Sequence, residues 1–172
     1  MISKSERLPC GTMVANENRP AMKVDEIPVA HTPTGGWHGE MPPLVLSGCD
    51  EPLANGLPDF RGLWQAFEVT DDGIPSADVR HRERIEQAGN RVVITAGGII
   101  HDMRADGTLE NGVNDVSARG FSPISVAARF EGETLVLRPN DAFVAVTRHL
   151  EGDVLVWNLV PLGRITRMRR VE

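Results

Sequence analysis

Residues 101–115 gather a dense set of groups capable of chemistry. They hold one histidine, one arginine, two asparagines and four carboxylates, with few large apolar side chains. A pair of strands with only a structural role would keep one continuous apolar face toward the core. The polar density therefore indicates a candidate catalytic or ligand-binding site. The simpler alternative is a hairpin tip whose charges are solvated.

The Asp106-Gly107 dipeptide is typical of a two-residue hairpin turn, because glycine readily takes the positive φ that such turns need. Counting along both predicted strands from this turn places His101, Glu110 and Asn114 on one face of the hairpin. Histidine titrates near neutral pH and a neighbouring carboxylate orients its ring. His101 beside Glu110 is therefore a candidate general base.

The opposite face of the same hairpin carries Asp102, Arg104 and Asn111, which is a charged pair with an amide nearby. Only one face of a barrel strand points inward, so the two sets of residues are alternatives. A β-bulge at Gly97-Gly98, just before this region, would exchange the two faces.

The elements that must position these residues begin at Asp59. From there the chain reads as short β-type runs separated by Asp-Gly, Gly-Asn, Glu-Gly-Glu and Glu-Gly-Asp breaks. About nine strands joined by short turns predict an all-β antiparallel meander, which closes into a barrel to remove its exposed edges. The runs are 63–70, 80–87, 91–105, 108–118, 124–131, 134–138, 143–150, 154–159 and 165–171.

Residues 1–58 have a different character from the predicted barrel, residues 59–172. Eight of the twelve prolines fall in this first part, and no period of 2 or 3.6 is sustained there. We expect an irregular arm. Its apolar residues, Trp37, Met41 and Leu44 to Leu46, favour an arm that wraps the barrel and covers an opening over one that is a mere tail.

Composition excludes several classes of function. A net charge of −6 gives no counter-ion drive to bind nucleic acid, and aromatic residues make up only 5%. No apolar run is long enough for a membrane span, and the first 20 residues do not read as a secretory signal. Two cysteines, Cys10 and Cys49, fit a reduced cytoplasmic protein. Zinc, calcium and phosphate-loop motifs are absent, so we expect no metal and no cofactor.

Two segments resemble known families. Residues 58–64, PDFRGLW, look like the opening Gly-x-Trp strand of lipocalin-like proteins. Here the order is Gly62, Leu63 and Trp64. Residues 146–171 resemble the last strands of fatty-acid-binding proteins. The resemblance implies a calycin-type barrel of about 8–10 strands that encloses one small molecule.

The resemblance also implies a role for the closing strand. In fatty-acid-binding proteins an arginine of a Thr-Arg-x-Tyr sequence holds the ligand carboxylate inside the barrel. Arg167 matches this arginine, while Arg169 stands at the tyrosine position. An arginine buried there must be paired or meet an anionic ligand. Trp64 and Trp157 are expected to fill the core or to contact the ligand.

Three functions follow from these expectations. The first is a barrel that binds a small hydrophobic or amphipathic molecule, with an arginine contacting its acidic or carbonyl group. The alternative is a cofactor-independent enzyme, an isomerase, cyclase or hydratase/lyase, that uses the histidine–carboxylate pair inside the barrel. The third is an interaction domain whose arm recruits a partner. A homodimer is left open.

Overall fold

The computed structural model describes residues 22–140 and 142–171, which form one antiparallel sheet of eleven strands that is nearly closed into a barrel. The all-β prediction is confirmed. The two described helices are short 3-10 turns, η1 (Val24–Glu26) and η2 (Val160–Leu162), and neither is long and apolar enough to cross a membrane. The strands are β1 (Gly62–Asp71), β2 (Ile74–Pro75), β3 (Arg82–Ala88), β4 (Arg91–Ala96), β5 (Ile99–Arg104), β6 (Val113–Val116), β7 (Pro123–Glu131), β8 (Thr134–Pro139), β9 (Val146–Glu151), β10 (Val154–Leu159) and β11 (Arg164–Arg170).

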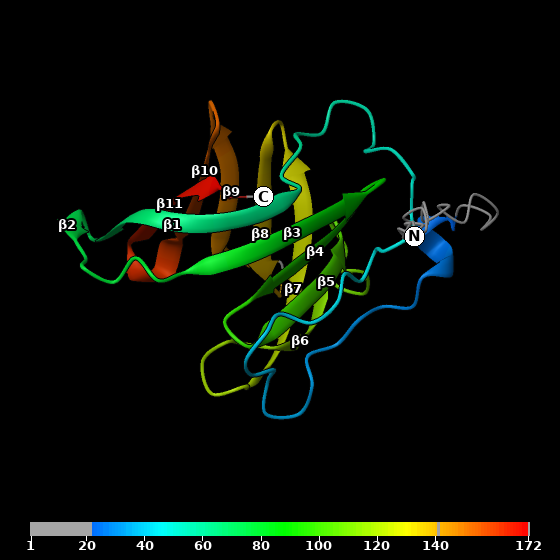
Figure 1. Cartoon of the computed structure of the whole chain (residues 1–172), viewed down its shortest axis with the longest axis horizontal. Coiled ribbons are helices and arrows are strands. Elements are labelled where there is room, and N and C mark those ends of the chain that lie inside the picture. The colour runs from blue at the N-terminus through cyan, green and yellow to red at the C-terminus, as the bar shows by residue number, and fades with distance from the viewer. Residues whose placement is uncertain (1–21, 141, 172) are drawn as a thin grey trace, which may run out of the picture.

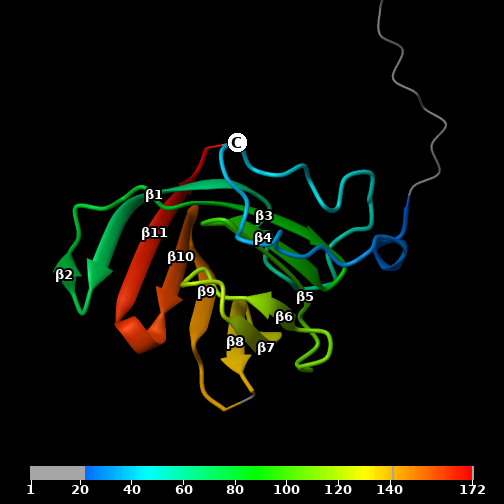
Figure 2. The ribbon, with the colours of Figure 1, turned by 90° about the horizontal axis from the view of Figure 1, so that it is seen from below.

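The strand order around the sheet is β5-β4-β3-β1-β11-β10-β9-β8-β7-β6, with β2 paired to β1 alone. Figures 1 and 2 show the sheet curling round until β5 and β6 face each other. This seam has no regular ladder in the described part of the chain. It is bridged by single hydrogen bonds, such as that from the Arg104 amide to the Asn111 carbonyl at 2.7 Å.

The predicted hairpin at Asp106-Gly107 is wrong. The chain reverses earlier, at Gly97-Gly98, so the run 91–105 is two strands and β5 pairs with β4. Gly97 and Gly98 both have positive φ, 56° and 87°, which a tight two-residue turn requires at consecutive positions. Residues 105–112 instead form a loop in which the Asp106 carboxylate accepts hydrogen bonds from Thr108 and Asn111.

Phe60 and Trp64 close one end of the barrel. Both are buried, the Trp64 indole donates a hydrogen bond to the Phe60 carbonyl at 2.7 Å, and the Phe60 amide donates to the Gln87 side chain at 2.6 Å. The Arg170 guanidinium covers the Trp64 ring at 4.8 Å. Trp64 therefore serves the core at the end where β1 begins and β3 finishes. The other large residues fully buried in this core are Ile85, Met103, Leu135, Leu155 and Met168.

The described part of the arm, residues 22–58, lies along the outer side of the sheet (Figure 2). Val24, Ile27 and Leu46 pack there against Val93 of β4 and Ile100 of β5. These contacts bury the outward faces of β4 and β5, while the inward faces of the same strands lie in the barrel core. A role for the arm as a cap over a ligand stays a prediction.

Candidate functional site

A charged pair crosses the barrel interior. Glu83 of β3 is fully buried, and its carboxylate accepts two hydrogen bonds from Arg148 of β9, both at 3.0 Å. Three strands separate β3 from β9 in the sheet, so the pair spans the inside of the barrel and does not run along its wall. Both side chains point inward, because each lies two residues from a core residue of its own strand, Ile85 in β3 and Leu150 in β9.

The carboxylate of this pair stays ionised. Burial by itself raises the pKa of Glu83, but the charge of Arg148 and the hydrogen bonds from His81 and Arg148 outweigh burial and lower the pKa to about 2. Near neutral pH the pair therefore consists of one negative and one positive charge and adds no net charge to the interior.

His81 and Trp157 complete the cluster. His81 Nε2 lies 3.1 Å from Glu83 Oε2, and the imidazole stacks on the Trp157 indole with 4.6 Å between ring centroids. The Arg148 guanidinium lies 5.5 Å from the centroid of the same indole. His81 precedes Glu83 by two residues, on the side of β3 away from the closed end. Its side chain is 24% exposed, so solvent reaches the cluster there.

Donors in this cluster are left without partners. The Trp157 Nε1 atom is buried and has no hydrogen-bond partner among the described residues. Arg148 uses Nε and Nη2 on Glu83, while its Nη1 group makes no hydrogen bond to any described residue. Because Trp157 Nε1 is buried, leaving this donor unsatisfied costs about 1–3 kcal/mol, which calls for a functional explanation. The cluster can offer hydrogen bonds to an acceptor atom.

His101 faces the same interior. It lies opposite Ile94 of β4, a core residue, and its Nε2 is 2.9 Å from the Val116 carbonyl oxygen. Burial lowers the pKa of His101, the hydrogen bond to Val116 opposes this, and the charge of Arg148 adds to the lowering. His101 is therefore mostly neutral at pH 7, and its ring donates the Nε2 proton to Val116.

The predicted pair of His101 and Glu110 is not brought together. Glu110 is exposed in the loop 105–112, and no hydrogen bond or ion pair of the described residues joins it to His101. The physical reason is the turn at Gly97-Gly98, which pairs β5 with β4 and leaves Glu110 outside any strand.

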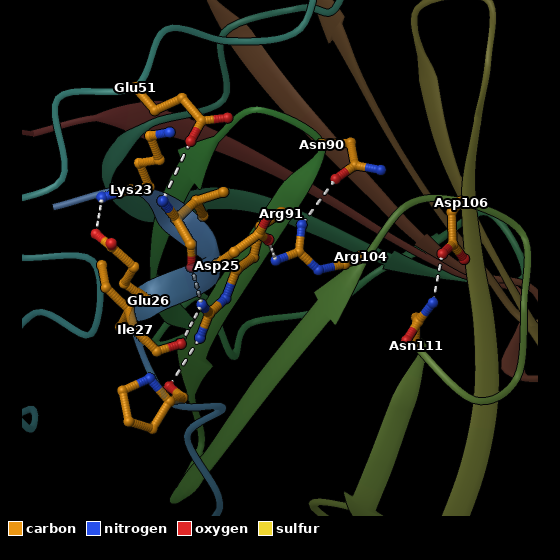
Figure 3. A network of polar contacts seen from close by, with 12 residues as sticks. Lys23, Asp25, Glu26, Ile27, Glu51, Asn90, Arg91, Arg104, Asp106 and Asn111 are labelled. Atoms are coloured by element: carbon orange, nitrogen blue, oxygen red, sulfur yellow. Dashed lines mark hydrogen bonds and ion pairs between the residues drawn. The ribbon is translucent and has the colours of Figure 1, made fainter.

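Asp102 has a different partner from the one predicted. Its carboxylate accepts two hydrogen bonds from Arg91, at 2.8 and 2.7 Å, and a third from the Ala30 amide at 2.8 Å. The remaining Arg91 donors bind the carbonyl oxygens of Val24, Ile27 and Pro28 in the arm. Figure 3 shows Arg91 reaching into the arm in this way. All five guanidinium N–H groups are satisfied, so the pair holds the arm on the sheet.

Arg104 lies next to the Arg91–Asp102 pair and itself pairs with Asp25 and the Asn90 side chain (Figure 3). A cavity of about 330 Å³ opens between the arm, β5 and the 105–115 segment. The predicted residues that line it are Asp102, Arg104, Glu110, Asn111 and Asn114. The structure thus brings members of both alternative sets together, on the outer side of β5 at the seam with β6.

The closing-strand arginines lie outside the barrel. β11 turns Thr166 and Met168 inward, and Arg167 alternates with them to pair with Glu68 at 2.8 Å and Glu151 at 3.4 Å. Arg169 covers the ring of Phe67 at 4.1 Å. The placement of Arg167 inside the barrel, implied by the resemblance, therefore does not match this structure, whereas Arg148 does lie in the interior.

Sequence reasoning missed His81, Glu83 and Arg148 as site residues. The segment 80–87, RHRERIEQ, has charged side chains at both alternating sets of positions, so it offers no apolar face that identifies the inward one. The available signal was the spacing of two between His81 and Glu83, which places them on one face of a strand. Within residues 22–140 and 142–171, no group of three or more His, Cys, Asp or Glu residues could hold a metal ion.

The chain was also compared with known proteins. No protein-family model matches it, and no curated protein matches it significantly in sequence.

Proposed function

We propose that the barrel binds a small amphipathic molecule whose polar group is an uncharged carbonyl, held by Arg148 and Trp157 beside His81. The observation that carries this proposal is the Glu83–Arg148 pair across the interior, with donor groups of Arg148 and Trp157 left over. The apolar part of the molecule would lie against partly buried side chains around the cluster, such as Val79 and Val146.

The charges of the cluster favour an uncharged ligand group. Glu83 already neutralises Arg148, and with a pKa of about 2 it is ionised at neutral pH. A ligand carboxylate would add a second anion beside Glu83 in a poorly solvated interior, which costs free energy. A ketone or amide oxygen accepts hydrogen bonds without that cost.

Matched ligands of one chain length test this proposal. We expect eight- to ten-carbon methyl ketones and primary amides to bind at least about tenfold more tightly than the corresponding carboxylates at pH 7.5. Binding is followed by tryptophan fluorescence, and Trp157→Phe identifies the reporting indole while Trp37→Phe is the control. Equal affinity for carboxylates, or a signal that survives unchanged in Trp157→Phe, would contradict the proposal.

A second function is favoured by the contact between His81 and Glu83. In the tautomer whose Nε2–H donates to the Glu83 carboxylate, the other ring nitrogen, Nδ1, carries a lone pair. Placed beside a bound ketone, this nitrogen would remove a proton from the carbon next to the carbonyl. The electron pair would move onto the oxygen near Arg148 to give an enolate, and return of the proton to the opposite face of that carbon, or to the γ-carbon of an unsaturated ketone, completes an isomerisation without any cofactor.

Hydrogen exchange detects this chemistry without knowledge of the natural substrate. In D₂O, the protein should exchange the α-protons of a bound methyl ketone faster than buffer alone, as seen by proton NMR. His81→Gln should lower the protein-dependent rate by about 10²- to 10⁴-fold, the usual contribution of a general base. His149→Gln, which changes a partly exposed histidine within β9, is the control. If ketones bind but their protons do not exchange, the barrel is a binding protein only.

A further inference from the structure

The outer face of β3 carries a row of arginines. Arg82 and Arg84 alternate with the inward Glu83 and Ile85, and Arg80 precedes them by the same spacing (β3 is labelled in Figure 1). Alternate residues of a strand lie on one face and repeat every ~6.6 Å. The side chains of Arg82 and Arg84 therefore leave the same face of β3, and with Arg80 they line one groove on the outside of the barrel.

This row borders a groove of about 730 Å³ between the arm and the sheet. The apolar part of its lining comes from Trp37, Met41 and Leu44 of the arm and from Leu63 of β1. Leu44 is 51% exposed although it is a large apolar residue. The groove thus joins an apolar wall to a basic wall, and Glu40 of the arm adds one carboxylate to its lining.

The basic wall is incompletely neutralised. Within the described part of the chain, Arg82 is exposed and has no carboxylate within ion-pair distance. Arg80 pairs with Asp78 on the surface, where a pair contributes at most about 1 kcal/mol. Arg84 donates to the Pro43 carbonyl and forms an ion pair with Glu86, its Nε lying 3.5 Å from a carboxylate oxygen. Arg82 is thus the arginine of the row that lacks a carboxylate partner in the described part of the chain, and the lining as a whole, with three arginines and Glu40, is positive in a chain whose net charge is −6.

We propose that this groove binds an extended acidic peptide segment of a partner protein, with a carboxylate at every second residue. An extended peptide repeats its side chains on one face at the same ~6.6 Å as the arginines, so each carboxylate would meet one guanidinium. Its alternate side chains would face Trp37, Met41 and Leu63. A groove with an apolar wall fits a peptide better than the flat surface of an anionic membrane.

Three synthetic hexapeptides, acetylated and amidated at their ends, test the pattern. The first alternates glutamate and valine, the second alternates glutamine and valine, and the third has three glutamates followed by three valines. Binding to the full chain is followed by tryptophan fluorescence, with Trp37→Phe removing the reporter in the groove. We expect the alternating acidic peptide to bind at least about tenfold more tightly than the other two, and less tightly as salt rises.

Two arginine variants locate the site. Arg82→Gln removes an exposed charge with no described ion pair, so folding should be unaffected while affinity for the alternating peptide falls about three- to tenfold. Arg119→Gln removes the same charge from the exposed loop between β6 and β7 and should change nothing. Equal effects of the two variants, equal binding of the block peptide, or tighter binding to phosphatidylserine vesicles than to the peptide would each overturn the proposal. Trp157→Phe, in the barrel interior, should leave peptide binding intact.

Discussion

Replacing Arg91 by methionine is expected to free the arm from the sheet and to lower the free energy of unfolding by about 3–5 kcal/mol. Arg91 is 2% exposed and makes five hydrogen bonds, two to Asp102 and three to arm carbonyls. Its loss leaves the Asp102 carboxylate buried without its counter-charge and the carbonyl oxygens without donors. Urea denaturation measures the stability, and limited proteolysis of residues 22–58 reports the release of the arm.

Arg104→Met is the matched control for this experiment. Arg104 lies directly opposite Arg91 in the β4–β5 ladder, but it pairs with Asp25, whose side chain is 77% exposed. A surface pair of this kind contributes about 0–1 kcal/mol, so this variant should stay close to the wild type. The double variant Arg91→Met/Asp102→Leu should recover part of the loss, because no unpaired charge remains. If the unfolding free energies of Arg91→Met and Arg104→Met lie within about 1 kcal/mol of each other, the Arg91–Asp102 pair does not hold the arm.

The architecture was largely predictable because turn chemistry is local. Asp-Gly and Glu-Gly pairs mark the strand breaks. Because short turns connect neighbouring antiparallel strands, short breaks between β-type runs predict an antiparallel meander. The same reasoning failed where two turn signals competed. Gly97-Gly98 and Asp106-Gly107 both suit a hairpin, and only the first reverses the chain into a ladder. Because β5 pairs with β4, every cross-strand neighbour of His101 differs from the predicted one.

The candidate site was less predictable because it depends on contacts across the barrel. Glu83 and Arg148 are 65 residues apart, and nothing local in either strand shows which polar residues face inward. The closing strand illustrates the same limit. A bulge in β1 between Ala66 and Glu68 shifts its pairing with β11, and Arg167 ends on the outer side with Glu68. Trp157, which was expected to fill the core or to contact a ligand, lies in the interior cluster, and its contact with a ligand stays a prediction.

Acid should destabilise this barrel through Glu83. The pKa of Glu83 in the folded protein is about 2, below the 4.5 of a free glutamate, because the charge of Arg148 and the hydrogen bond from His81 outweigh burial. A depressed pKa contributes stability that is fully present above about pH 4.5 and is lost as the pH falls toward 2. Because one pH unit corresponds to about 1.4 kcal/mol, the stability at stake is on the order of 3 kcal/mol.

The measurement compares wild type with Glu83→Gln/Arg148→Met by urea denaturation at pH 7, 4.5, 3.5 and 2.5. The double variant removes both charges at once, so neither is left unpaired in the interior. We expect the stability of the wild type to fall more steeply than that of the double variant across this range, so that the difference between the two changes by about 2–3 kcal/mol between pH 7 and pH 2.5. Asp71→Asn is the control, since Asp71 pairs with Arg164 in the same bidentate geometry but at the surface, where solvent screens the charges. It should leave the steep fall in place. Parallel curves for the wild type and the double variant would show that the interior pair does not titrate with folding, and the charge argument for an uncharged ligand group would lose its basis.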